Sequence, residues 1–271
     1  FGQQVVGRVV EMGSGTSRFR PGDYVGVPWL HGCCFSCPYC LVGKENLCDH
    51  PLFTGYHVNG GFAEYCTAHE AFVLPVPPQY DPIHAAPLFC AGLIGYRALM
   101  KASEADAIGL YGFGSSAHLT LQAARAFSKR VFVFTRPNDK EGQQFALQLG
   151  AEWAGGSDEA PPEKLDAALI FAPVGALMVE ALKHVKKGAP VISAGIHMSP
   201  IPEFSYDLLW GERSLSSVAN LTRQDGIEFM SLAARVPFRV EVTSYPLDQA
   251  NAALESIRSG RLKGSAVLVI Q

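Results

Sequence analysis

Four cysteines, Cys34, Cys37, Cys40 and Cys48, lie within one short segment of the chain. Two residues separate each of the first three, and seven residues precede the fourth. This spacing allows a single loop to surround one tetrahedral metal ion with four thiolates. Such a shell leaves no open coordination position, so the pattern predicts a zinc ion that holds the loop in shape and takes no part in chemistry.

Two other uses of these cysteines remain open. An iron–sulfur site can begin with the same C-x2-C-x2-C spacing but continues x3-C-P, whereas here the fourth cysteine comes later and Asp49 follows it. Disulfides are the second alternative, although cysteines three residues apart form a poor disulfide framework and an intracellular enzyme would keep them reduced. Cys33 lies directly beside Cys34, but the regular spacing favours Cys34 as the ligand.

The composition is that of a soluble globular protein with room for one large or two moderate domains: 271 residues, 48% hydrophobic, 17% charged, with a net charge of -3. No basic block indicates nucleic acid, and no apolar run approaches the ~18 residues of a membrane helix. We therefore expect no nucleic-acid or membrane partner and a cytoplasmic location. The chain begins at Phe1 as a strand already under way, without an initiating methionine, so we expect further residues before it.

The sequence pattern changes near residue 92. Before that point, short β-type runs are broken by glycine and proline, which predicts a small antiparallel barrel. Its expected strands are residues 5–10, 23–27, 61–65 and 71–74. After that point, buried apolar runs alternate with helical stretches, which predicts an α/β domain with a parallel, doubly wound sheet. Its expected strands are residues 108–111, 131–135, 167–171, 191–194 and 215–218, and its expected helices are 116–127, 140–149 and 176–186.

The chain beyond Arg223 departs from this alternation. It predicts one helix, a strand at residues 239–243, an amphipathic helix at 247–259 and a final strand at 266–270.

The first strand of the alternating half runs directly into the hexapeptide G-F-G-S-S-A at residues 112–117. This is the G-x-G-x-x-A form of the dinucleotide fingerprint, in which glycines let the backbone approach a pyrophosphate and a helix N-terminus faces the anion. The motif alone is weak, and a tight glycine turn in an unrelated α/β fold is the alternative, but the order strand, turn, helix, strand strengthens it. We expect cofactor contacts from Gly112, Gly114, Ser115, Ser116 and Ala117.

The next strand ends at Thr135 and Arg136, where a protein that prefers NAD would carry Asp or Glu to bind the ribose 2′-hydroxyl. A hydroxyl followed by a guanidinium can instead bind a 2′-phosphate, which an acidic side chain would repel. These two residues predict a preference for NADP(H) over NAD(H). The alternative is that Arg136 is a solvated residue at a strand end.

A cysteine-rich lobe in front of a nucleotide-binding sheet resembles the zinc-dependent alcohol dehydrogenases of the medium-chain dehydrogenase/reductase superfamily. The matching motifs run along nearly the whole chain: G-R-V-V at 7–10, P-G-D-Y-V at 21–25, G-K-E-N-L-C at 43–48, T-G-Y at 54–56, G-G-F-A-E-Y at 60–65, P-L-F-C-A-G at 87–92, Y-P-L at 245–247 and G-S-A-V-L at 264–268. The resemblance implies a GroES-like β-barrel catalytic domain formed by residues 1–92 and 231–271, with a Rossmann domain at residues 93–230 between them.

The resemblance also implies a second, catalytic zinc, bound by an early cysteine, by the histidine of a G-H-E segment and by a cysteine that matches Cys90. In this chain, Gly2, Gln3 and Gln4 occupy the positions of the G-H-E segment, so the neutral amide of Gln3 replaces the imidazole ligand. The early cysteine would lie before Phe1. We expect an impaired catalytic site and, because family members add strands before this point, a barrel left open beside Gln3.

Further contacts with the nicotinamide end are implied by the resemblance. The matching residues are Ala172, Pro173, Val174, Ala194, Gly195, Ile196, Asn220 and Leu221. The implied activity is the reversible NADP-linked interconversion of a small primary or secondary alcohol with its aldehyde or ketone, in a homodimer or homotetramer. Two alternatives are a noncatalytic NADP-binding member with a structural zinc, and a zinc-independent quinone or enone reductase, a group that generally lacks the four-cysteine loop.

Overall fold

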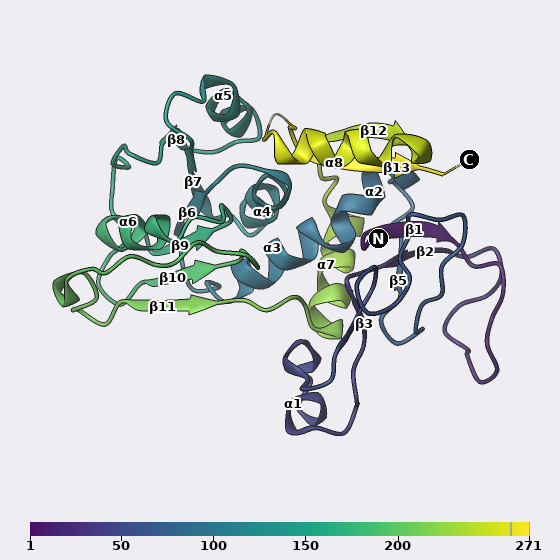
Figure 1. The fold of residues 1–271 in the computed structure, drawn as a ribbon. Coiled ribbons are helices and arrows are strands. Elements are labelled where there is room, and N and C mark those ends of the chain that lie inside the picture. Colours follow the sequence, from purple (N-terminus) through teal and green to yellow (C-terminus); the bar gives the residue numbers. More distant parts are fainter. Residues whose placement is uncertain (261, 271) are drawn as a thin grey trace. The chain divides into compact units, whose positions relative to one another are not determined.

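The computed structural model describes residues 1–260 and 262–270, and the chain forms two units (Figure 1). Unit 1 consists of Phe1–Leu93 and Asn220–Gln271, and unit 2 of Ile94–Ala219. The first division between the units follows Leu93, and the sequence predicts a domain boundary after residue 92. The second division lies before Asn220, whereas we expected the second part of the catalytic domain to begin at residue 231. The difference arises because the helix at Arg223–Arg235 packs within unit 1.

Unit 2 is built on a six-stranded sheet in the order β11-β10-β9-β6-β7-β8, with all neighbouring strands parallel. The strands are β6 (Ala107–Tyr111), β7 (Arg130–Thr135), β8 (Trp153–Gly156), β9 (Ala167–Ile170), β10 (Pro190–Ser193) and β11 (Ser214–Ser217). The helices are α3 (Ala91–Met100), which begins in unit 1, α4 (Ser115–Ala126), α5 (Lys140–Gln148), α6 (Ala176–His184) and η3 (Tyr206–Leu208). In this order the chain reverses direction across the sheet between β6 and β9, which is the arrangement of the Rossmann fold.

The five parallel strands expected from the apolar runs are confirmed, each to within one residue. The sixth, β8, was not expected because its sequence W-A-G-G has two glycines and little β propensity. It forms because its backbone pairs with β7, and because the Trp153 ring packs edge-on against Phe134, with the ring centroids 5.1 Å apart.

Unit 1 contains three small sheets among its described residues, in the orders β1-β2-β5, β3-β4 and β12-β13. The strands are β1 (Val5–Arg8), β2 (Tyr24–Val27), β3 (Leu30–Gly32), β4 (Leu52–Phe53), β5 (Leu74–Pro75), β12 (Val242–Pro246) and β13 (Ser265–Val269). The helices are α1 (Pro38–Leu41), η1 (Glu45–Leu47), α2 (Pro82–Ala85), η2 (Ala86–Phe89), α7 (Arg223–Arg235), η4 (Leu247–Gln249) and α8 (Ala250–Arg258).

Three of the strand predictions in unit 1 need correction. Of the strand expected at residues 71–74, only Leu74 is in a strand, β5, because the N–H groups of Phe72 and Val73 bond to the carbonyl oxygens of His69 and Glu70 in a turn. Residues 61–65 form bends instead of a strand, because the N–H groups of Gly61 and Phe62 bond to the carbonyl oxygens of Gly2 and Phe1 outside any regular ladder. The strand expected at 239–243 begins later, at Val242, where the pairing with β13 starts.

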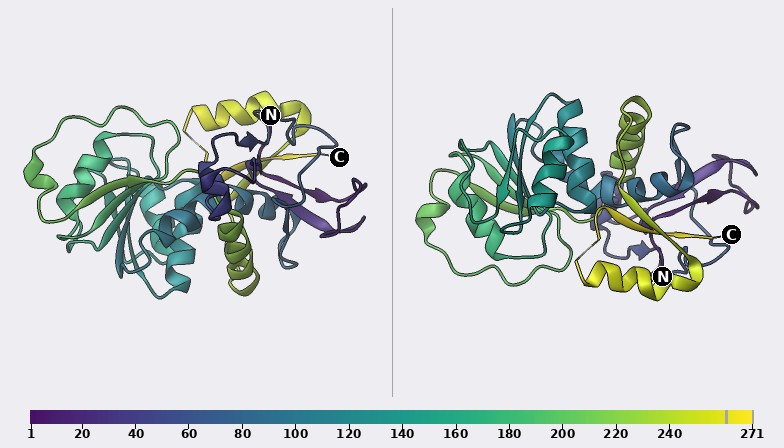
Figure 2. Two further views of the ribbon diagram at one scale, coloured as in Figure 1. Left: turned by 90° about the horizontal axis from the view of Figure 1, so that it is seen from below. Right: turned by 90° about the horizontal axis from the view of Figure 1, so that it is seen from above.

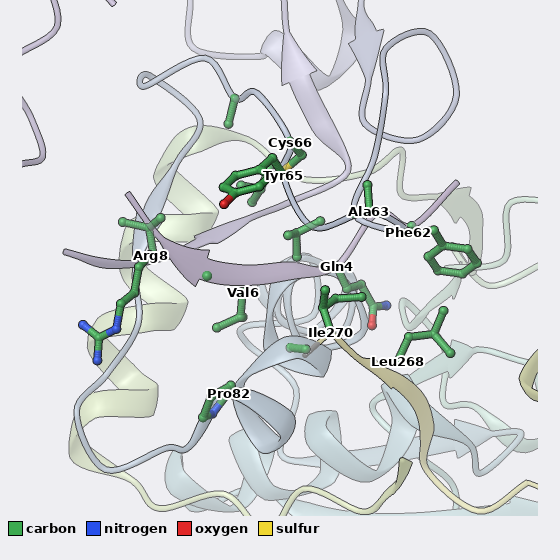
Figure 3. A pocket seen from close by; sticks show the side chains of 18 of the residues that line it. Gln4, Val6, Arg8, Phe62, Ala63, Tyr65, Cys66, Pro82, Leu268 and Ile270 are labelled. Carbon is green, nitrogen blue, oxygen red and sulfur yellow. The ribbon is translucent and has the colours of Figure 1, made fainter. Parts of the chain in front are cut away.

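The expected open barrel is confirmed for the described residues. β1 pairs only with β2, and β13 pairs only with β12, so each leaves one edge without a ladder partner. A cavity of about 1230 Å³ lies between them and includes Gln3 in its lining. Figure 3 shows Val6, Phe62, Leu268 and Ile270 around this cavity.

Helix α7 is anchored in unit 1 at its start and along its length. A capping box closes its N-terminus: the Thr222 hydroxyl accepts from the Asp225 N–H, and the Asp225 carboxylate accepts from the Thr222 N–H. Along the helix, Phe229 lies against Gly92, where an added Cβ would come within 2.4 Å of the ring. The views in Figure 2 show this helix as a separate rod beside the strands of unit 1.

No single helix in the described ranges is long and apolar enough to cross a membrane, and one bent pair, Pro82–Phe89 with Ala91–Met100, passes that test by length and composition only.

Candidate functional site

The four predicted metal ligands come together in unit 1. One sulfur from each of Cys34, Cys37, Cys40 and Cys48 lies within 4.8 Å of the other three. The sulfurs of Cys34 and Cys40 are 3.9 Å apart, and those of Cys37 and Cys40 are 3.5 Å apart. Four sulfurs at ~2.3 Å from a central ion form a tetrahedron with edges of about 3.8 Å, whereas a disulfide bond is about 2.05 Å long. The cluster therefore has the dimensions of a tetrahedral thiolate site.

Backbone N–H groups point at these sulfurs and prepare them to be thiolates. Three sulfurs each accept two such bonds: Cys34 from Ser36 and Cys37, Cys37 from Cys40 and Asp49, and Cys48 from Cys34 and His50. The bonds lower the pKa of Cys34 to about 6, whereas burial raises the pKa of Cys40 and of Cys48. Since a metal ligand must be deprotonated, a bound cation would offset the cost of the buried charges. The donor set fits zinc.

An ion pair that sequence analysis did not anticipate holds this loop to α7. The Glu45 side chain is only 3% exposed, and its carboxylate bonds to the guanidinium of Arg223. The same guanidinium lies over the rings of Phe35 and Phe72, at 5.6 and 5.8 Å from their centroids. No sequence spacing indicates the pair, because its two members are far apart in the chain.

Cys90 and Gln3, the two predicted catalytic positions, are brought together. Cys90 follows η2 and is partly buried, and its sulfur is hydrogen-bonded by the side chains of Gln3 and Gln4. Burial raises the pKa of the Cys90 thiol, and the two amide contacts offset this only in part. The Oε1 of Gln3 is buried and has no hydrogen-bond partner in the described part of the chain, so its amide nitrogen makes the contact with sulfur.

Cys90, Gln3 and Gln4 do not by themselves fit a catalytic zinc. Such a site needs three protein ligands drawn from thiolate, imidazole and carboxylate. Cys90 offers one thiol, and its neighbours Gln3 and Gln4 offer neutral amides, which are poor zinc ligands. The amide nitrogens also direct their hydrogens toward the sulfur, where a cation would have to bind.

The glycine turn in unit 2 has the geometry of a phosphate-binding loop. Gly112 has φ +89°, and an added Cβ would lie 2.7 Å from the backbone nitrogen of Ala172, so only glycine fits there. Gly114 has open space around it and directly precedes α4. The turn lies at the carboxyl end of β6, beside the end of β9, where the strand order reverses and where ligands bind in such sheets.

The two residues predicted to select the cofactor are placed differently. The Thr135 hydroxyl is buried; it donates to backbone oxygens and accepts from the Gln143 side chain. Arg136 is exposed at the end of β7, and its guanidinium makes no hydrogen bond or ion pair within the described ranges. The Thr135 hydroxyl is therefore hydrogen-bonded within the protein, in part to Gln143, a residue that the sequence motif did not indicate. Of the two predicted residues, only Arg136 is exposed to solvent.

The residues implied to line the nicotinamide end divide between the units. In unit 2, Ala172, Pro173 and Val174 follow β9, and Ala194, Gly195 and Ile196 follow β10, all at carboxyl ends of strands. Asn220 and Leu221 belong to unit 1, where the Leu221 side chain is 3% exposed. The first six are thus brought to the same sheet edge as the glycine turn.

Comparison with known proteins agrees with this architecture. Residues 1–78 match the family model of the alcohol dehydrogenase GroES-like domain. The Mycobacterium tuberculosis (strain CDC 1551 / Oshkosh) protein named probable alcohol dehydrogenase AdhA is 42% identical over 277 residues, which cover 99% of this chain and 80% of that protein. This chain belongs to the alcohol dehydrogenase family.

Other members of the alcohol dehydrogenase family extend the match. An alcohol dehydrogenase of Geobacillus stearothermophilus is 33% identical over 280 residues, covering 100% of this chain and 82% of that protein. Among solved structures, a cinnamyl alcohol dehydrogenase from Sorghum bicolor has the same fold, with a TM-score of 0.89, 24% identity and coverage of 99% of this chain and 80% of that one. An acetophenone reductase from Geotrichum candidum, solved with NAD, has a TM-score of 0.86, 26% identity and coverage of 98% and 80%. The chain is an oxidoreductase by this membership.

Proposed function

We propose that this alcohol dehydrogenase family member binds NADP(H) in preference to NAD(H) and interconverts a small primary or secondary alcohol with its aldehyde or ketone. The observation that carries the cofactor preference is Arg136, an exposed guanidinium without a protein partner in the described ranges, at the end of the strand that follows the glycine turn. A guanidinium there favours a 2′-phosphate, and no acidic side chain ends β7 to bind a ribose hydroxyl.

The residues of the chain have defined tasks in this function. The N–H groups at the start of α4 bind the pyrophosphate, and Gly112 and Gly114 let it approach the backbone. The segments after β9 and β10 orient the nicotinamide ring, which supplies or accepts the hydride when bound. The acetophenone reductase solved with NAD supports a nicotinamide cofactor for this chain as well.

The role proposed for zinc is structural. The four-cysteine loop would bind one ion and hold the segment between β3 and β4 in shape, whereas Cys90 with Gln3 and Gln4 would bind none. The neutral amides beside Cys90 favour a second candidate function, that of a family member that binds NADP without turning over alcohols. The four-cysteine loop argues against a zinc-independent quinone or enone reductase.

Nucleotide titration and activity assays together test the proposal. We expect NADPH to bind more tightly than NADH in a fluorescence titration, and tighter NADH binding would remove the role given to Arg136. A panel of aldehydes with NADPH then separates the two candidates. Turnover supports the dehydrogenase, and nucleotide binding without turnover supports the noncatalytic member.

Assembly and location complete the proposal. We propose a homodimer or homotetramer in the cytoplasm, where a reducing environment keeps the four ligand cysteines as thiols. Light scattering after size-exclusion chromatography would measure the mass, and a monomer would contradict the proposed assembly.

A further inference from the structure

A buried histidine lies directly behind the glycine turn of unit 2. His118 belongs to α4, and its side chain is in the interior, with the residue only 1% exposed. Its Nδ1 is 3.2 Å from the carbonyl oxygen of Gly114, the residue that precedes the helix. A carbonyl oxygen can only accept a hydrogen bond, so Nδ1 carries the proton and donates it. A buried imidazole in place of an apolar side chain thus contributes one specific bond to the turn.

This bond gives the Gly114 carbonyl oxygen a second donor. The backbone N–H of His118 also bonds to it, at 3.1 Å, which is the ordinary first bond of an α-helix. The peptide unit between Gly114 and Ser115 is trans and planar, so its C=O and its N–H point in opposite directions. Two donors that hold the oxygen toward the helix therefore hold the Ser115 N–H in the opposite direction, away from the helix.

Aromatic packing keeps the imidazole in this position. The ring of Phe145, on α5, lies beside that of His118 with the centroids 6.2 Å apart. The ring of Phe113, within the glycine turn, meets Phe145 edge-on with the centroids 5.7 Å apart. These rings join the turn to both helices, and together with the burial of His118 they restrict rotation of the imidazole away from the Gly114 oxygen.

The second donor also favours an anion in front of the turn. Hydrogen bonds to a carbonyl oxygen polarise the peptide unit, so the N–H of the same unit becomes a stronger donor. Gly114 is the N-cap residue of α4, and no side chain caps the helix start through a hydrogen bond. An added Cβ at Gly114 would meet nothing within 4 Å, so there is room for a ligand beside this peptide.

We propose that His118 is a positioning residue for the cofactor: its Nδ1–H fixes the Gly114–Ser115 peptide so that the Ser115 N–H donates to the pyrophosphate. This inference rests on the nucleotide site of the proposed function. It predicts that another side chain able to donate to the Gly114 oxygen can replace the imidazole and that an apolar one cannot. It also predicts that the loss is confined to ligands with a pyrophosphate, which a role in packing alone would not produce.

The test compares His118→Leu with His118→Gln in the full chain. Leucine keeps an apolar side chain in the buried position but has no donor. Glutamine can donate to a carbonyl oxygen four residues earlier, as Gln122 of the same helix does to the His118 oxygen at 3.0 Å. Gln122→Met is the matched control, because it removes a similar side-chain bond one turn further along the helix.

Two ligands separate an effect on the pyrophosphate from general damage. Calorimetric titration measures the affinity for NADPH and for adenosine 2′-monophosphate, which has no pyrophosphate. We expect His118→Leu to bind NADPH roughly fivefold more weakly, the effect of one lost hydrogen bond, and to bind adenosine 2′-monophosphate as the unsubstituted chain does. His118→Gln should recover most of the NADPH affinity, and Gln122→Met should retain it.

Three results would overturn the inference. These are equal NADPH affinity in His118→Leu and Gln122→Met, an equal fold-loss of both ligands in His118→Leu, and a loss in His118→Gln as large as that in His118→Leu. Retained binding of adenosine 2′-monophosphate shows that a variant is folded. A chain that binds neither NADPH nor NADH would overturn the proposed function itself, and titration of the unsubstituted chain identifies that case.

Discussion

The phenol oxygen of Tyr111 lies 2.9 Å from Nδ1 of His184 in the buried interior of unit 2. Phe134 stacks on Tyr111 with ring centroids 4.0 Å apart and also stacks on His184 at 5.7 Å. Tyr111 is the last residue of β6, directly before the glycine turn. The imidazole thus supports the strand end that positions the nucleotide-binding loop.

This arrangement makes the stability of unit 2 sensitive to acid. Burial lowers the pKa of His184 from its ordinary value of 6.5. The nearby Glu180 carboxylate acts to raise this pKa, and the Lys164 and Lys183 ammonium groups lower it by smaller amounts. The unfolded chain therefore binds this proton more readily, so stability falls as pH drops below about 6.5 toward the folded-state pKa. His184→Gln should lessen the loss between pH 7.5 and 5.5 in urea unfolding. Exposed His197→Gln is the control, and an equal acid loss in the His184 variant would contradict the account.

Removing one member of the Glu45–Arg223 ion pair should lower the stability of the protein. Arg223→Met leaves the buried Glu45 carboxylate without its cation, and we expect the free energy of unfolding to fall by about 3 kcal/mol. Arg235→Met, on the last turn of the same helix, should change it little. The double variant Glu45→Gln with Arg223→Met should recover part of the loss. If Arg223→Met were no worse than Arg235→Met, the pair would not anchor the loop.

Arg136 should control cofactor choice without affecting the fold. Arg136→Asp replaces a cation with an anion that repels a 2′-phosphate and can bind a ribose hydroxyl. We expect NADPH affinity to fall by at least tenfold and NADH affinity to be equal or higher in fluorescence titrations. Arg258→Asp, on the exposed face of α8 in unit 1, is the charge-matched control. Parallel loss of both nucleotides in Arg136→Asp would indicate general damage to the site instead.

The two glycines of the turn should respond differently to alanine. Gly112→Ala forces a side chain into a left-handed backbone against Ala172 and should destabilise unit 2. Gly114→Ala meets open space within the chain and should leave thermal unfolding nearly unchanged, yet its methyl group obstructs an approaching pyrophosphate and should weaken NADPH binding. Unaltered NADPH affinity in Gly114→Ala would place the cofactor elsewhere.

The parts of the molecule that follow local rules could be predicted from sequence. Apolar runs predicted β6, β7, β9 and β10, which are almost entirely buried, and the spacing of the cysteines predicted the cluster. Where structure depends on distant partners, sequence was insufficient. Strand β8 forms because β7 is beside it, and residues 61–65 fail to form a strand because their N–H groups bond to Phe1 and Gly2.

In the candidate site, too, local motifs could be predicted from sequence and contacts between separate elements could not. A motif identified Thr135 and Arg136 together, but the Gln143 side chain that engages the Thr135 hydroxyl is contributed by the helix that follows. Contacts of this kind depend on side-chain directions within folded loops, which spacing does not determine.

The zinc content of the purified chain tests most directly the claim that its zinc is structural. Inductively coupled plasma mass spectrometry should find one zinc per chain, which Cys48→Ser should remove and Cys90→Ala should leave in place. Two zinc ions per chain, with one lost in Cys90→Ala, would contradict the account and show that Cys90 holds a metal despite its glutamine neighbours.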